Sequence, residues 1–146
     1  MPAGEFCHLS PPPGSAEEEE WVWTQIKAEA RRDAEAEPAL ASYLYSTILS
    51  HSSLERSLSF HLGNKLCSST LLSTLLYDLF LNIFSNDASL RSATVADLRA
   101  ARFRDPACVS FSHCLLNYKG FLACQVPFFL ISTVLSPVSR TSAGGV

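Results

Sequence analysis

Apolar residues recur at three- and four-residue intervals along most of this chain, which is the spacing of one face of an α-helix. Two runs keep the four-residue interval without a break: Leu40, Leu44 and Ile48, and then Leu54, Leu58, Leu62 and Leu66. No alternation of apolar and polar residues, which would indicate a strand, occurs before residue 110. The pattern predicts an all-α fold, an antiparallel helical bundle of about five to six helices.

Capping signals and charges indicate where these helices begin and end. The segment 17–36 consists of strong helix formers, acidic at its start and basic near its end, as the helix dipole favours. Pro38 suits a first helical residue, and the segments 52–55 and 94–97 have the form of capping boxes. We therefore expect helices over 17–36, 38–50, 54–66, 70–84, 94–103 and 110–125.

The two ends of the chain differ in composition from its middle. Residues 1–16 contain three consecutive prolines followed by glycine and serine, a composition that buries too little apolar surface to fold. Residues 126–146 lose all periodicity and collect proline, serine and glycine. The sequence thus predicts a disordered leader over 1–16, a helical domain over 17–125 and an irregular tail over 126–146.

Charge and cysteine content exclude several classes of function. The net charge of −3 gives no electrostatic reason to expect nucleic acid as a partner. The five cysteines show no C-x-x-C spacing, so we interpret them as reduced thiols in a cytoplasmic protein. An acidic N-terminal segment is unlike an organelle transit peptide.

Hydropathy indicates contact with another chain but not with a membrane. Hydrophobic residues make up 47% of the chain and charged residues 17%, so part of the apolar surface is expected to meet a partner. The longest apolar run, 120–135, is interrupted by Gln125 and Pro127 and is shorter than the roughly 20 residues of a membrane span. A small membrane-associated helical protein, suggested by Leu71 to Phe84 and the apolar tail, is the weaker alternative.

The sequence contains none of the common catalytic and binding motifs. The histidines are scattered, with only Cys108, His113 and Cys114 close together, so no metal site is predicted. No glycine-rich phosphate loop and no G-x-S-x-G nucleophile motif occurs. Four arginines form either a phosphate-binding strip or, as we favour, the basic turn that a helix C-terminus attracts: Arg91, Arg99, Arg102 and Arg104.

Asp105 is the one candidate site residue. It follows a basic turn and precedes Pro106, which biases its backbone toward an extended conformation. Arg102 and Arg104 should favour its ionised form, and a fixed carboxylate can bind an ammonium group. The alternative is an aspartate that only caps or pairs locally.

Five segments together resemble the N-terminal domain of plant-type serine O-acetyltransferases. They are Trp23 to Ala30, Glu37 to Ser42, Gly63 to Leu66, Arg104 to Ala107 and Tyr118 to Phe121, within a similarity that runs from Glu17 to Gln125. The resemblance implies a helical domain that assembles trimers into hexamers, followed by a β-helix of hexapeptide repeats. In that second part a histidine acts as the general base when L-serine attacks acetyl-CoA.

The resemblance also places Asp105, the aspartate of an Arg-Asp-Pro motif, in the amino-acid substrate site. It implies no catalytic base, no metal and no cofactor site in this chain, since acetyl-CoA is the co-substrate of the complete family enzyme. After Gln125 the sequence departs from the family pattern. A translated retained intron is our hypothesis for this break, and it predicts a truncated product, inactive alone.

Two hypotheses for function remain open at this stage. The chain is part of a serine acetyltransferase of cysteine biosynthesis, or it is a non-catalytic oligomerisation module that binds copies of itself or the full-length enzyme. A separate choice concerns the apolar segment 70–84: it serves either as intrachain core or as a subunit interface.

Overall fold

The computed structural model of this chain describes residues 10–117 and, beyond them, residues 121 and 125. Within these residues every regular element is helical, which confirms the predicted all-α class. The elements are, in chain order, α2 (Ala16–Ala36), η1 (Pro38–Leu40), α3 (Ala41–Leu44), η2 (Tyr45–Leu49), α4 (Leu54–Leu66), α5 (Ser73–Asn86), α6 (Ala88–Arg104) and α7 (Phe111–Asn117).

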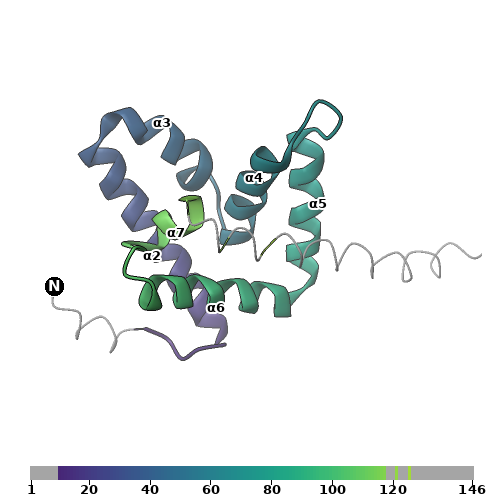
Figure 1. Cartoon of the computed structure of the whole chain (residues 1–146). Helices are drawn as coiled ribbons and strands as arrows, with labels where there is room; N and C mark the ends of the chain where they lie inside the picture. Colours follow the sequence, from purple (N-terminus) through teal and green to yellow (C-terminus); the bar gives the residue numbers. More distant parts are fainter. Residues whose placement is uncertain (1–9, 118–120, 122–124, 126–146) are drawn as a thin grey trace, which may run out of the picture.

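Helix α2 is the central element of the packing. It contacts η1, α3, η2, α6 and α7, while α4 and α5 form a hairpin to one side (Figure 1). The face of α2 that carries Val22, Ile26 and Ala30 is fully buried, as the four-residue spacing predicts. Helix α7 meets both α2 and α6, and its Cys114 and Leu115 are also fully buried. Helix α7 therefore contributes directly to the core.

The segment 38–49 is helical throughout, but it is not one regular α-helix. Pro38 opens a turn of 3₁₀-helix, one turn of α-helix follows, and residues 45–49 widen into a π-turn. Such changes of pitch let a helix bring selected side chains inward, and here Leu44 and Ile48 are buried. The Ser57 hydroxyl donates to the Thr47 carbonyl at 2.7 Å, so α4 holds this irregular segment in place.

Helix α6 begins earlier than the sequence predicts. It starts at Ala88, not at Thr94, because Asp87 is the residue that caps it: the Asp87 carboxylate accepts the Leu90 amide at 3.0 Å. Thr94 lies inside the helix, where its hydroxyl donates to the Leu90 carbonyl at 2.9 Å. The predicted capping box at 94–97 is therefore wrong.

The predicted capping box at 52–55 is wrong as well, although the helix that follows it is confirmed. The N-terminal cap of α4 is Ser53, and its side chain makes no capping hydrogen bond. The predicted helix over 110–125 is described over Phe111–Asn117 and at residues 121 and 125. Its other residues, residues 1–9 of the predicted leader over 1–16, and the predicted tail over 126–146 lie outside the described residues.

His61 connects the α4 hairpin to α7 and supplies a pH-dependent contribution to stability. Its Nε2 lies 3.0 Å from the Leu116 carbonyl oxygen, and burial lowers the pKa of the ring below 6.5, an effect only partly offset by that hydrogen bond. The unfolded chain therefore binds the proton more readily than the folded one. The contribution of His61 to stability is expected to be fully present above pH 6.5 and to be lost as the pH falls toward the pKa of the ring in the folded chain.

His61→Gln should flatten this part of the pH profile, because glutamine keeps a donor for the Leu116 carbonyl and does not titrate. Urea unfolding at pH 7.5, 6.5 and 5.5 measures the difference between the variant and the wild-type chain. His113→Gln is the matched control, since His113 is exposed. Parallel pH profiles for His61→Gln and the wild type would show that the ring has the same pKa in the folded and unfolded chains.

Candidate functional site

Asp105 begins a tight turn at the end of α6. Its own amide donates to the Ala101 carbonyl and so completes the last turn of the helix, while its backbone is extended as Pro106 predicts. One carboxylate oxygen accepts the Ala107 amide at 2.9 Å, and its carbonyl accepts the Cys108 amide at 3.0 Å. Asp105 thus both ends α6 and organises the turn that follows.

The surface around this turn is mostly exposed. Asp105 is half-buried, and Phe103 and Val109 expose 53% and 68% of their surface. The Arg102 guanidinium lies 3.4 Å from the Cys108 carbonyl oxygen, on the far side of the same turn. The structure therefore presents the carboxylate on an accessible turn flanked by apolar side chains.

Two of the four arginines considered as a phosphate-binding strip, Arg91 and Arg99, are bound by groups of the chain itself. Arg91 donates to the Phe84 carbonyl at 2.6 Å and to the Ser85 carbonyl at 3.1 Å. Arg99 donates to Glu18 at 2.9 Å and lies over the Trp21 ring at 5.8 Å. Because these two cations are occupied by groups of the chain itself, the phosphate-binding alternative is not supported.

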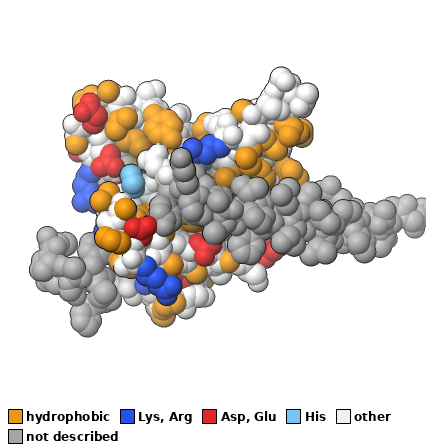
Figure 2. All heavy atoms as spheres, in the orientation of Figure 1, with side chains coloured by type: hydrophobic (Ala, Val, Ile, Leu, Met, Phe, Trp, Pro, Cys, Tyr) orange, Lys and Arg blue, Asp and Glu red, His pale blue; other side chains and the backbone are white. Residues whose placement is uncertain are grey.

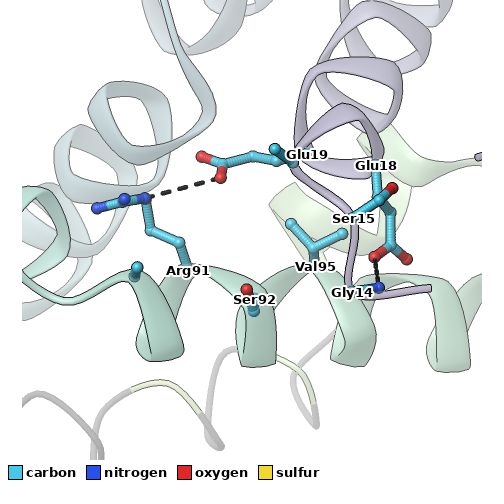
Figure 3. A pocket seen from close by; sticks show the side chains of 9 residues that line it. Gly14, Ser15, Glu18, Glu19, Arg91, Ser92 and Val95 are labelled. Carbon is cyan, nitrogen blue, oxygen red and sulfur yellow. Dashed lines mark hydrogen bonds and ion pairs between the residues drawn. The ribbon is translucent and has the colours of Figure 1, made fainter. Parts of the chain in front are cut away.

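One ion pair joins α2 to α6 beside a small pocket of about 220 Å³, shown in Figure 3. Glu19 and Arg91 are 3.7 Å apart on one side of it, and on the other side Glu18 accepts the Gly14 amide (Figure 3). Burial raises the pKa of Glu19, the nearby Glu55 raises it further, and Arg91 opposes both effects. These contacts fix the start of α2 against α6, which is a structural role.

Helix α7 is anchored to α2 by a carboxylate as well. Glu29 accepts the Ser112 amide at 2.9 Å, and burial raises the pKa of this carboxyl group against the opposing effects of Ser112 and Arg102. The Phe111 ring makes edge contacts with Trp21 and Phe103, at centroid distances of 6.0 Å and 5.9 Å. The beginning of α7 is therefore held firmly beside the Asp105 turn.

The cysteines differ from the sequence prediction. Cys108 and Cys114 are joined by a disulfide, with Cα atoms 6.0 Å apart, whereas Cys67 is free and exposed. The prediction that all five cysteines are reduced thiols is thus wrong for this pair. Both residues follow Pro106, so their proximity depends on the link 108–110 and on the first turn of α7, and their spacing carries no recognised signature.

The hairpin of α4 and α5 exposes a group of leucines that we call the leucine face. Figure 2 shows hydrophobic side chains gathered over this side of the molecule. Its members are Leu66, Leu71, Leu72, Leu75 and Leu79. The opposite face of α5 buries Leu76, Phe80 and Phe84 in the core, so this helix is apolar on two sides. For segment 70–84 the sequence allowed intrachain core or subunit interface: the core role is confirmed by these buried residues, and the subunit interface stays a prediction.

In the part of the chain that the structure describes, the helical domain combines the half-buried Asp105 turn with the exposed leucine face. The family model for the N-terminal domain of serine acetyltransferase matches residues 22–126. This chain belongs to that family, in agreement with the resemblance of its sequence.

Relatives of known structure and sequence support the same assignment. The chain is 91% identical to serine acetyltransferase 5 of Arabidopsis thaliana over 104 residues, which cover 71% of this chain and 33% of that protein. It is 75% identical to a probable serine acetyltransferase 1 of Oryza sativa over 115 residues, or 38% of that protein. The chain therefore spans about a third of the length of these curated relatives.

Solved structures share the fold. Soybean serine acetyltransferase complexed with serine is 89% identical, with a TM-score of 0.73 over 76% of this chain and 46% of that one. A serine acetyltransferase in complex with CoA is 35% identical, with a TM-score of 0.77 over 86% of this chain and 52% of that one. In the residues that our structure describes, no helix is both long and apolar enough to cross a membrane.

Proposed function

We propose that this chain is the assembly part of a serine O-acetyltransferase, the enzyme that converts acetyl-CoA and L-serine to O-acetyl-L-serine and CoA for cysteine biosynthesis. Its family membership supports this proposal. The leucine face is the observation that carries the assembly role, because a soluble domain rarely exposes a contiguous group of leucines without a partner. The occupant we propose is a second serine acetyltransferase N-terminal domain, either of this chain or of the full-length enzyme.

Asp105 is the residue of this domain that we assign to the L-serine site. An accessible, backbone-fixed carboxylate suits the ammonium group of an amino acid, and Asp105 starts a hydrogen-bonded turn. It would orient the substrate and not act as the base, which in this family belongs to the repeats that follow. We further propose a cytoplasmic location, although two relatives are named as chloroplastic and mitochondrial enzymes.

Charges placed on the leucine face should separate the assembled chain into smaller species. Leu72 and Leu75 expose 63% and 57% of their surface, so Leu72→Glu and Leu75→Glu together leave the fold intact but require buried charges at the interface. Size-exclusion chromatography with light scattering should show the wild-type chain as an oligomer and the double variant as a monomer.

Leu40→Glu provides the matched control, because Leu40 is also exposed but lies on η1, away from α5. It should leave the mass of the oligomer unchanged. The same measurement repeated with a full-length homologue tests joint assembly. A wild-type chain that stays monomeric and never joins the homologue would contradict the assembly role.

Incubation of the purified chain with acetyl-CoA and L-serine tests whether catalysis belongs to this polypeptide. We expect no O-acetylserine, because the family resemblance assigns the base to hexapeptide repeats and the described residues form helices without a strand. Turnover above the uncatalysed rate would contradict this expectation and favour an enzymatic role for the chain alone.

A further inference from the structure

The Cys108–Cys114 pair connects the Asp105 turn to α7. The Cα separation of 6.0 Å lies within the range of ordinary disulfides. Both residues are buried, with 2% and 0% of their surface exposed. Because only six positions separate them, the bond closes a small ring made of the end of the turn and the beginning of the helix.

Hydrogen bonds connect this ring to Asp105. The Cys108 amide donates to the Asp105 carbonyl, and the Asp105 carboxylate accepts the Ala107 amide. Residues 105–108 therefore form one hydrogen-bonded unit that ends at Cys108. Any displacement of Cys108 must stretch or break the first of these bonds.

The other end of the ring is fixed. Cys114 sits in α7, which Glu29 anchors through the Ser112 amide and which Phe111 packs against α2 and α6. The disulfide thus ties a turn with exposed side chains, Ala107 and Val109, to an immobile part of the core. Without the bond, only hydrogen bonds and the burial of Cys108 hold the turn.

We propose that Cys108 and Cys114 are a reversible thiol–disulfide pair that positions Asp105, and that the oxidation state of the pair sets the affinity for L-serine. This inference rests on the proposed role of Asp105 in the serine site. A disulfide oxidant such as oxidised glutathione oxidises the pair by thiol–disulfide exchange. One cysteine thiolate attacks it and releases one glutathione, and the second cysteine then displaces the other glutathione. Two thiols are oxidised, and one glutathione disulfide is reduced to two glutathiones.

Access to the buried sulfurs requires the turn to open. The thiolate is the attacking species, so oxidation and reduction proceed from conformations in which Cys108 has left its hydrogen bond to Asp105. Once formed, the disulfide removes these open conformations from the ensemble. The oxidised chain should therefore protect the amides of Ala107 and Cys108 from hydrogen exchange on the order of tenfold better than the reduced chain.

The first experiment uses the full chain in glutathione redox buffers. Alkylation and peptide mass mapping should show Cys108 and Cys114 losing their labels together as oxidised glutathione increases, and regaining them with dithiothreitol. Cys67, which is exposed and free, is the internal control, and Cys7→Ser, Cys67→Ser and Cys124→Ser together exclude exchange with the cysteines outside the pair. Labels that never disappear, or amide exchange that is identical in the two states, would overturn the proposal without involving any variant of the pair.

The second experiment joins residues 1–125 to the catalytic part of the Arabidopsis relative and measures steady-state kinetics in both redox states. Oxidation should lower the KM for L-serine by about fivefold or more, with kcat and the KM for acetyl-CoA unchanged. Asp105→Asn should raise the KM for L-serine and abolish its redox dependence. A redox-insensitive KM in a chain whose pair does cycle would overturn the positioning role. An Asp105→Asn KM equal to that of the wild type would instead overturn the proposed serine site.

Discussion

Replacing Arg99 with methionine should lower the free energy of unfolding by about 3–5 kcal/mol, the cost of leaving one charge of a buried pair without its partner. The guanidinium of Arg99 lies 2.9 Å from the Glu18 carboxylate, and the two side chains expose only 19% and 5% of their surface. Methionine fills a similar volume but cannot donate, so the Glu18 carboxylate keeps only the Gly14 amide.

Two further variants separate the loss of the pair from the loss of packing. Glu18→Gln combined with Arg99→Met should recover more than half of the lost stability, because no unpaired charge stays buried. Arg104→Met is the matched control on the same helix, since Arg104 is exposed, and should change stability by less than about 0.5 kcal/mol. Urea unfolding of all four chains measures these differences. Equal losses for Arg99→Met and Arg104→Met would mean that Glu18 is solvated in the folded chain.

Periodic leucines made most of the helices predictable. A helix whose apolar residues recur every fourth position tends to bury that face: Leu54, Leu58 and Leu62 are buried, while Leu66 at the end of the run is exposed. Periodicity does not determine which side of α5 is exposed, because an all-apolar helix shows which residues avoid water but not what covers them. In the structure Leu76 and Phe80 fill the core, which leaves Leu75 and Leu79 on the exposed leucine face.

Capping signals in the sequence predicted the wrong start of α6 because two residues that can cap a helix compete for that position. Asp87 and Thr94 are both good N-terminal caps, and the sequence between them contains a single leucine. Burial of Leu90 decided the outcome: once its side chain enters the core, its amide lies within reach of Asp87. Tertiary packing thus selected the cap.

Contacts between distant residues were beyond the reach of sequence reasoning. Arg99 was interpreted as part of a basic helix end, but its partner Glu18 is 81 positions away. Cys108 and Cys114 are close in sequence, yet their pairing depends on how the link 108–110 enters α7. The turn at Asp105 was predictable because proline restricts the residue before it. The partner of its carboxylate, the Ala107 amide, was not.

Gly63→Val should destabilise the α4–α5 hairpin by about 2–3 kcal/mol, because it overfills a backbone contact. A Cβ atom at this position would lie 3.0 Å from the Ser73 carbonyl oxygen and 3.3 Å from the Tyr77 amide nitrogen. Both atoms belong to the α5 backbone, so no side chain can rotate away. The two helices would have to separate, and Leu62 and Leu76 would lose contacts with the core.

Asn64→Val is the control that distinguishes crowding from helix propensity. Asn64 follows Gly63 in α4 but is exposed, so the same β-branched residue is introduced without a clash. Because valine is a better helix former than glycine, propensity alone predicts that Gly63→Val stabilises the chain, which is opposite in sign to the crowding effect. Thermal and urea unfolding decide between them. A Gly63→Val variant at least as stable as the wild type would show that α4 and α5 can move apart at little cost. Position 63 would then need glycine neither for packing nor for presenting the leucine face.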